Sequence, residues 1–514
     1  MRLDKRQILR NVGSSWFALG VNVLVGIFLS PFILHRLGNV AYGAWVLVFS
    51  ITGYYGLFDL GIRSSVIRYV SSYTASGNRD GLARLINTSL ALYTLIGMVA
   101  LLLTVVLSTV MGSLFRIPAD LLATARWLFL MVGTAVALGF PAGVFSGVLE
   151  GLSRFYVVNL TNIFASLLRA ALIVLALTHG RGLLTVGLIT VVLPMLGSCV
   201  HAFIALRLLR IDFRWSYVTP GSFREIARFS GAAFILLLAY KLRFKSDELI
   251  ISSFLSVGAV TFFSNADRLV DYTSEVVSGL AQIFVPMSGQ SEATGDMERL
   301  RKIFVAGNRA CALVVLPITA TLIILGKSVI TAWVGPSYVG TCYPVMLVLL
   351  IPCTFALAQA ASPRILFGMA RHRTLAWVVA IEGIANIVLS IVLIRPYGIL
   401  GDALGTAIPL LCTTLFFMPG HLCRVLDVRM RTFLREAYLL PLLLCAPTVA
   451  TLLLVRRWFF ATTYLQVGMQ ILIGLLPYGL GLAWAASTSR AWNVGPIPPR
   501  TNAIADRPMV SERS

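Results

Sequence analysis

Five charged side chains lie in the middle of an apolar stretch at residues 228–255, which reads RFSGAAFILLLAYKLRFKSDELIISSFL. They are Lys241, Arg243, Lys245, Asp247 and Glu248. An ionisable group at bilayer depth costs about 2.5–3.5 kcal/mol, so five of them facing lipid would cost roughly 12–17 kcal/mol. We therefore expect these side chains to face water, protein or a charged ligand. Because bases outnumber acids here, the chemistry they suit is the binding of an anion.

The stretch has two polar faces if it forms one continuous helix. At 3.6 residues per turn, Lys241, Lys245 and Glu248 fall on one face. Arg243 and Asp247 lie on nearly the opposite face, one turn apart, where an acid and a base can pair. We interpret the first face as the wall of a cationic cavity. On the second face, Arg243 and Asp247 form a structural pair, unless a bend in the helix brings both faces to water.

Other apolar spans also carry ionisable residues. Arg268, Asp271 and Glu275 share one face of the helix expected at residues 258–286. Asp59 and Arg63 are spaced four residues apart, so we favour a pair that neutralises itself.

Two more ionisable residues, Arg169 and Glu382, interrupt expected spans of their own. Polar groups like these can hold neighbouring helices together. Where bases outnumber nearby acids, as at Arg169 and Arg268, we favour a role in function.

The sequence predicts no catalytic residue, metal site or cofactor. The seven cysteines are scattered without a CxxC pair, and the five histidines are dispersed. Gly326-Lys327-Ser328 resembles the end of a phosphate loop, but no glycine-rich loop precedes it.

Composition predicts an all-α polytopic membrane protein. The chain is 58% hydrophobic and 12% charged, with a mean hydropathy of +0.86, whereas soluble domains have about 25% charged residues. Fourteen apolar stretches approach or exceed the 20 residues needed to cross a bilayer. They are 9–34, 40–67, 84–113, 120–147, 154–178, 183–207, 228–255, 258–286, 302–333, 342–369, 374–395, 399–423, 433–455 and 464–488.

The distribution of charge predicts the orientation. The net charge is +21, and 27 Lys and Arg side chains fall in the loops and tails of one side, against six on the other. Basic loops face the cytoplasm, so both termini are expected there. Because basic cytoplasmic loops account for the net positive charge, no nucleic-acid partner is expected.

An internal repeat at an offset of 218 residues suggests how the chain is divided. Arg10-Asn11-Val12-Gly13 aligns with Arg228-Phe229-Ser230-Gly231, and paired repeats of this kind are common in secondary transporters. We expect a first six-helix lobe at 1–207, a basic cytoplasmic linker at 208–227 and a second six-helix lobe at 228–423. Two further helices at 424–488 and a disordered cytoplasmic tail at 489–514 complete the chain.

Several motifs together resemble those of the Wzx-like polysaccharide transporters. They are FILHRLG at 32–38, YGAW at 42–45, GYYGLFDLGI at 53–62 and SDELII at 246–251. The family belongs to the multidrug/oligosaccharidyl-lipid/polysaccharide flippase superfamily. The resemblance implies two six-helix lobes around a central cavity. It also implies transfer of an undecaprenyl-pyrophosphate-linked oligosaccharide from the cytoplasmic to the outer leaflet of a bacterial inner membrane.

The resemblance assigns roles to the embedded charges, within an alternating-access cycle. The pyrophosphate would bind Arg169, Lys241, Lys245 and Arg268. Coupling to an ion gradient would use Asp59, Asp271, Glu275 or Glu382. Membrane lipids and other polysaccharide biosynthesis proteins are the further partners expected.

Two alternatives remain open. A multidrug exporter of the same superfamily would need a cavity rich in acids. A membrane polysaccharide polymerase or ligase would need a long outer loop to carry catalytic residues.

Overall fold

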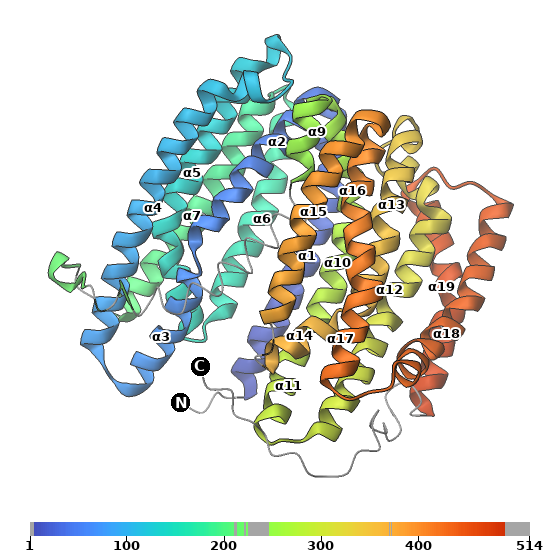
Figure 1. The fold of residues 1–514 in the computed structure, drawn as a ribbon. Helices are drawn as coiled ribbons and strands as arrows, with labels where there is room; N and C mark the ends of the chain where they lie inside the picture. The colour runs from blue at the N-terminus through green and yellow to red at the C-terminus, as the bar shows by residue number, and fades with distance from the viewer. Residues whose placement is uncertain are drawn as a thin grey trace. The chain divides into compact units, whose positions relative to one another are not determined.

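The computed structural model describes residues 5–209, 213–219, 221, 223–224, 246–369, 371 and 373–488. All regular secondary structure in these ranges is helical (Figure 1). Within the same ranges, twelve segments are long and apolar enough to cross a membrane. The prediction of an all-α polytopic membrane protein is confirmed.

The two other expected spans have different outcomes. Residues 258–286 largely form α10 (Val257–Ala281), which is not one of the twelve and carries Arg268 near its middle, with Asp271 and Glu275 after it. Of the stretch 228–255, only the part from Ser246 onward is described, and it forms α9 (Asp247–Phe254). The count of fourteen spans stays a prediction.

The described chain forms two compact units. The first unit comprises Met1–Asp267, Trp333–Val345 and Val379–Thr406. Its elements are α1 (Lys5–Leu37), α2 (Asn39–Tyr54), η1 (Tyr55–Asp59), α3 (Ile62–Ser76), α4 (Arg79–Leu114), α5 (Ala119–Gly151), α6 (Phe155–Thr178), α7 (Leu183–Leu209), η2 (Trp215–Tyr217), α9, the start of α10, η3 (Pro336–Tyr338), most of α15 (Arg373–Tyr397) and most of α16 (Ile399–Cys412).

The second unit comprises Arg268–Ala332, Met346–Val378 and Ala407–Ser514. Its elements are the rest of α10, α11 (Phe284–Ala293), α12 (Met297–Trp333), most of α13 (Val339–Ala358), α14 (Ala361–Gly368), the π-helical turn η4 (Thr413–Phe417), α17 (Met418–Val425), α18 (Met430–Trp458) and α19 (Tyr464–Ser487). The predicted lobes at 1–207 and 228–423 stay a prediction.

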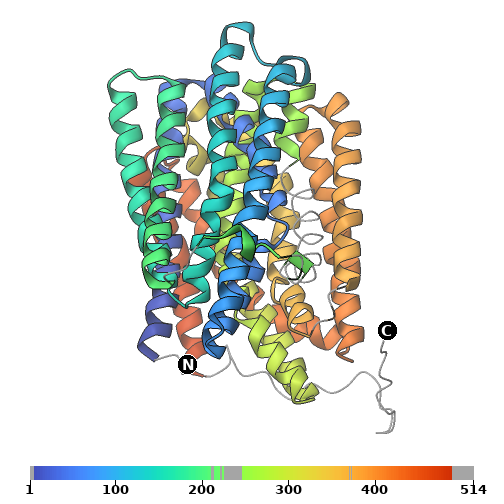
Figure 2. The ribbon, with the colours of Figure 1, turned by 90° about the vertical axis from the view of Figure 1, so that its left-hand side faces the viewer.

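In the first unit, α5 packs between α4 and α7 (Figures 1 and 2). Glycines bring α4 and α5 together, since a Cβ on Gly97 would lie 2.5 Å from the Ala137 carbonyl oxygen. A Cβ on Gly133 would lie 2.3 Å from Thr104 Cγ2. Small residues at helix contacts let backbones approach closely inside membranes, where lipid gives little hydrophobic driving force.

The span expected as one helix at 40–67 is broken, which corrects the prediction. Helix α2 ends at Tyr54, a 3₁₀ turn follows, and α3 begins at Ile62. Leu60 and Gly61 both adopt the left-handed conformation, with φ of 50° and 78°. A left-handed residue cannot continue a right-handed helix, so the chain changes direction here.

The second unit departs from one expected continuous span, because residues 342–369 divide into α13 and α14. The span expected at 399–423 is one continuous segment, Ile399–Val425, in which the π-helical turn η4 joins α16 to α17. Inside the unit, the Gln359 side chain donates a 2.9 Å hydrogen bond to the Thr414 carbonyl. This bond ties the turn after α13 to the π-helical turn, where irregular backbone needs a partner within protein.

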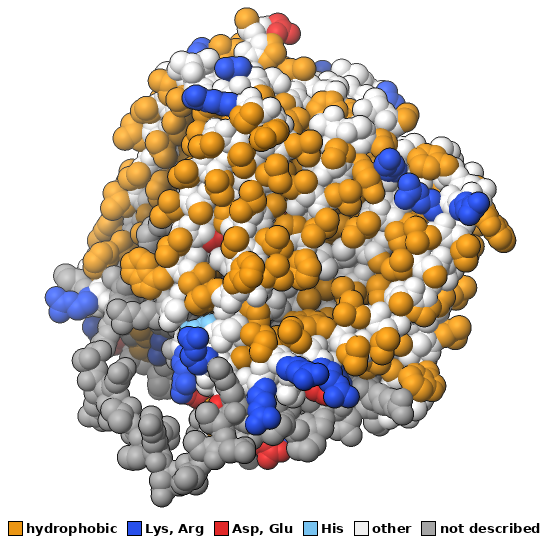
Figure 3. Space-filling view, turned by 45° about the vertical axis from the view of Figure 1, so that its right-hand side comes forward, with side chains coloured by type: hydrophobic (Ala, Val, Ile, Leu, Met, Phe, Trp, Pro, Cys, Tyr) orange, Lys and Arg blue, Asp and Glu red, His pale blue; other side chains and the backbone are white. Residues whose placement is uncertain are grey.

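The outer face of the C-terminal helix is strongly apolar. Leu465, Leu472 and Leu480 on α19 are 70–75% exposed. Figure 3 shows hydrophobic side chains covering most of one face of the molecule, with Lys and Arg gathered toward its upper and lower edges. Such an apolar face rimmed by basic side chains is the surface of a multi-pass membrane protein.

Candidate functional site

A buried polar cluster joins α9, α15 and α16 in the first unit. Helix α9 begins with two acids, Asp247 and Glu248, which are 4% and 6% exposed. The free N–H groups at a helix N-terminus favour negative charge, and this explains why two acids are tolerated in the first turn.

Hydrogen bonds connect Asp247 to both neighbouring helices. The Asn386 amide on α15 donates to the Thr406 hydroxyl at 2.8 Å. That hydroxyl lies 3.1 Å from each carboxylate oxygen of Asp247 and donates to them. The Ser246 hydroxyl donates to the side-chain amide oxygen of Asn386 at 3.5 Å. The three helices are therefore held together through one chain of side chains.

A third carboxylate, Asp402, lies near Asp247 and Glu248. It is fully buried at the start of α16 and within electrostatic range of both acids. Among the described residues, neither carboxylate oxygen of Asp402 has a hydrogen-bond partner. Buried like charges this close cannot all be ionised without a counter-ion. The cluster is therefore stable only with a positive charge beside it or a proton bound to it.

Glycines explain how α16 comes so close to α15. A Cβ on Gly405 would lie 2.2 Å from Ser390 Oγ, and a Cβ on Gly401 would lie 2.0 Å from the Leu393 carbonyl oxygen. Ser390 in turn donates a 3.1 Å hydrogen bond to the Asp402 carbonyl. Glu382, an expected coupling residue, lies on α15 one turn before Asn386 and is 3% exposed.

The expected pair of Asp59 with Arg63 is corrected by the structure. The Arg63 guanidinium pairs with Glu150 on α5 at 2.5 Å. Asp59 instead accepts a hydrogen bond from the Arg63 backbone N–H at 3.2 Å and another from the Tyr93 hydroxyl. Because the helix breaks between them, the four-residue spacing does not place the two side chains together.

The expected cationic residues fall into two groups. Lys241, Arg243 and Lys245 lie outside the described residues, so their roles stay predictions. Asp247, the expected partner of Arg243, is bonded to Thr406.

The described members of the cationic set lie on α6 and α10. Arg169 is partly buried on α6, and its side chain has no ion pair or hydrogen bond to any described residue. On α10, Arg268 and Asp271 are partly buried, whereas Glu275 is exposed. Because these three lie on one α-helix at i, i+3 and i+7, they share a face, and their roles stay predictions.

Sequence reasoning missed Asp402, Thr406 and Glu150. Asp402 could have been found as the one acid in the span 399–423, and Thr406 follows it by one turn. Nothing local identifies Glu150 as a partner, because 87 residues separate it from Arg63. Within the described part of the chain, no group of three His, Cys, Asp or Glu side chains is arranged to hold a metal ion.

Residues 8–292, more than half of the chain, match the polysaccharide biosynthesis protein family, and the chain belongs to this family. The resemblance to polysaccharide transporters that the motifs indicated is thereby confirmed. The uncharacterized membrane protein EpsK of Bacillus subtilis (strain 168) is 22% identical over 429 residues, covering 83% of this chain and 85% of EpsK. A putative O-antigen transporter of Shigella flexneri is 19% identical over 425 residues, covering 82% of this chain and 99% of the transporter.

Solved transporters share the fold. The lipid II flippase MurJ, in an inward closed conformation, aligns with a TM-score of 0.70 at 16% identity, covering 94% of this chain and all of MurJ. An inward-facing MATE family multidrug resistance transporter of the MOP superfamily aligns with a TM-score of 0.63 at 14% identity, covering 79% and 94%. The relatives with a named activity are transporters and not enzymes, as the sequence led us to expect.

Proposed function

We propose that this protein transfers an undecaprenyl-pyrophosphate-linked oligosaccharide from the cytoplasmic to the outer leaflet of a bacterial inner membrane, for surface or exopolysaccharide biosynthesis. Both termini lie in the cytoplasm. The family match and the transporter fold support this proposal, together with the basic residues placed inside the spans. The cycle is alternating access, in which the substrate site opens first to one side and then to the other.

Arg169 is the observation that carries the proposal. It lies inside the apolar span Phe155–Thr178, where a cation costs about 2.5–3.5 kcal/mol. No described residue pairs with it, so an anionic ligand is the natural source of compensation. Pyrophosphate suits a guanidinium, because two N–H donors can bind two oxygens side by side. Lys241, Lys245 and Arg268 complete the proposed substrate site.

A translocation assay with lipid-linked oligosaccharide in proteoliposomes tests this function. We expect Arg169→Ala to lower the rate at least tenfold and Arg169→Lys to restore part of it. Arg181→Ala, in the loop after the same helix, is the matched control and should change the rate less than twofold. Full transport by correctly inserted Arg169→Ala protein would remove Arg169 from the substrate site.

A second pair of variants tests the proposed contacts of Lys241 and Lys245 with the substrate. Lys241→Ala and Lys245→Ala should each slow transfer severalfold, and the double variant should be slower than either. No transfer of lipid-linked oligosaccharide by the unmodified protein, under conditions in which a known flippase works, would overturn the proposed function itself.

The buried cluster of Asp247, Glu248 and Asp402 supports coupling of transfer to a proton or small cation. A cationic drug is a poor occupant, because each of these side chains is at most 6% exposed. This burial counts against the multidrug exporter as an alternative. Glu382 is part of the same buried region and takes the coupling role expected for it, whereas Asp59, Asp271 and Glu275 lie elsewhere in the chain.

A further inference from the structure

Four arginines gather around the turn that joins α17 to α18 in the second unit. They are Arg424, Arg429, Arg431 and Arg435, all of them exposed and within twelve residues of one another. Clustered like charges repel one another when no counter-ion is near, so these four positive charges need a negative partner.

The two acids of the same segment already have partners on another helix. Asp427 pairs with Arg301 of α12 at 3.7 Å. Glu436 pairs with the buried Arg309 of α12 at 3.2 Å, and its backbone carbonyl accepts a second bond from Arg309 at 2.7 Å. The side chains of the four exposed arginines have no ion pair or hydrogen bond to any described residue. Their guanidinium groups are therefore available to a ligand from outside the chain.

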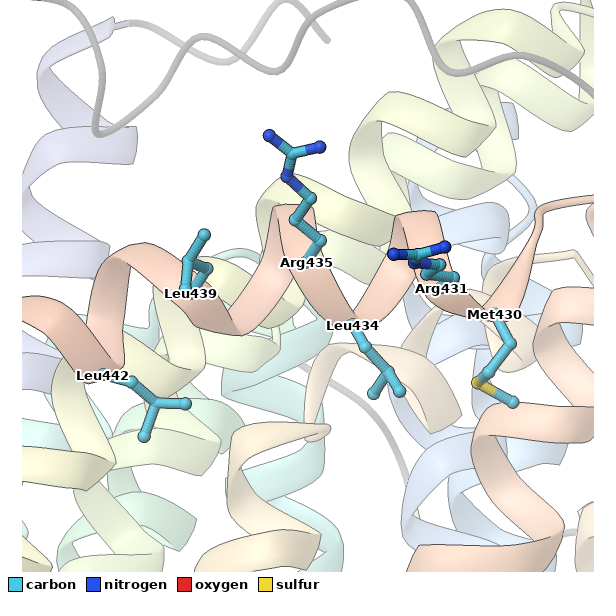
Figure 4. A pocket seen from close by; sticks show the side chains of 6 residues that line it. All are labelled: Met430, Arg431, Leu434, Arg435, Leu439 and Leu442. Carbon is cyan, nitrogen blue, oxygen red and sulfur yellow. The ribbon is translucent and has the colours of Figure 1, made fainter.

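Next to these arginines, α18 carries a shallow apolar groove (Figure 4). Six side chains of one helix line it. They are Met430, Arg431, Leu434, Arg435, Leu439 and Leu442. The apolar members are 38–54% exposed, so described protein does not cover them. The groove thus has one end that carries both arginines beside Met430 and Leu434, and another end, at Leu439 and Leu442, that is wholly apolar.

Along the groove, arginines are followed by apolar side chains, just as the phosphate of a phospholipid is followed by its acyl chains. Helix α18 is an expected membrane span, Met430–Trp458, and the arginines lie in its first two turns. From Arg435 to Leu442 the helix rises roughly 10 Å, within the roughly 15 Å depth of one leaflet's hydrocarbon layer. A phosphate bound by Arg431 and Arg435 would therefore leave an acyl chain against Leu439 and Leu442.

We propose that this groove binds an anionic phospholipid of the surrounding bilayer. The phosphate of such a lipid accepts paired hydrogen bonds from guanidinium groups, and it lacks the amine that would offset its charge in a zwitterionic lipid. Clustered basic residues at the cytoplasmic end of a membrane helix attract anionic lipid. The bound lipid is distinct from the transported substrate.

Lipid binding to the full chain, purified in detergent, tests the proposal by native mass spectrometry. Phosphatidylglycerol and phosphatidylcholine are the two probes. We expect tighter binding of phosphatidylglycerol, and a loss of at least fivefold in its affinity in the double variant Arg431→Gln/Arg435→Gln. The matched control, Arg456→Gln/Arg457→Gln, removes two arginines from the other end of the same helix and should bind as the unmodified protein does.

Any of four results would overturn the proposal. One is equal binding of the two lipids, and another is an equal loss of binding in both double variants. The third is preferential binding of undecaprenyl pyrophosphate over phosphatidylglycerol at this groove, which would make it part of the substrate path. If the glutamine variant fails to fold, Leu439→Ser, which leaves all the arginines in place, should still weaken phosphatidylglycerol at least twofold. Unchanged binding by Leu439→Ser would also contradict the proposal.

Discussion

At the scale of single residues, Asp402 is the most informative side chain in the structure. It is fully buried beside Asp247 and Glu248, and its carboxylate has no hydrogen-bond partner among the described residues. Such a group costs several kcal/mol unless it is protonated or neutralised by a cation. A residue retained at that cost, in a span that would be more stable without it, is a strong candidate for ion coupling.

We predict that Asp402→Asn uncouples transport while leaving the protein folded. Asparagine keeps the shape and removes the charge, so thermal stability should stay equal or rise. The dependence of lipid-linked oligosaccharide transfer on an imposed proton or sodium gradient should fall at least tenfold. Asp120→Asn, an exposed acid in the first turn of α5, is the control and should leave the gradient dependence intact. A gradient dependence equal to that of the unmodified protein would eliminate Asp402 as the coupling site.

Arg63 and Glu150 form a second residue-scale test. Their side chains are 45% and 12% exposed, so solvent screens the pair and its coupling energy should be modest, about 0.2–1 kcal/mol. A double-mutant cycle with Arg63→Gln and Glu150→Gln, followed by thermal unfolding in detergent, measures this coupling. The same cycle between Arg63 and Asp59 should give a smaller value. A larger coupling to Asp59 would restore the pairing that the sequence suggested.

At the scale of elements, close helix contacts decide where the site forms. We predict that Gly405→Ala destabilises the protein by about 1–3 kcal/mol, because its Cβ would lie 2.2 Å from Ser390 Oγ. Gly139→Ala in α5 is a matched control, since nothing lies within 4 Å of its Cβ. The control should be neutral or slightly stabilising. Unfolding temperatures in one detergent compare the two variants, and equal effects would show that the helix contact is not tight.

The sequence predicted elements better than it predicted the joints between them. Hydropathy identified the described spans because twenty apolar residues in a row have few alternatives to a membrane helix. It did not reveal the break after Tyr54, because Leu60 is apolar and a leucine rarely adopts the left-handed conformation that ends the helix here. The site was predictable only in part. The sequence places Glu382 one turn before the polar residue Asn386 on the same helix. The proximity of Asp402 to Asp247 depends instead on how α16 packs against α9, two helices far apart in the sequence.

At the scale of the whole molecule, the arginine distribution makes a prediction about topology. With 27 basic residues on one side and six on the other, both termini should face the cytoplasm. The turn between α18 and α19, residues 459–463, should then face outward, although Arg456 and Arg457 stand just before it. These two residues are the largest local exception to the charge rule, so this turn is the most demanding place to test it.

Reporter fusions measure the topology directly. Green fluorescent protein, which is fluorescent only when it folds in the cytoplasm, should be bright when fused after residue 514. Alkaline phosphatase, which is active only outside the cytoplasm, should be active when inserted at 459–463 and inactive at 294–296. An even number of spans requires both termini to share one side, so opposite signals from fusions at the two ends would mean an odd number. A reversed pattern at every site would place the basic loops outside and overturn the proposed direction of transfer.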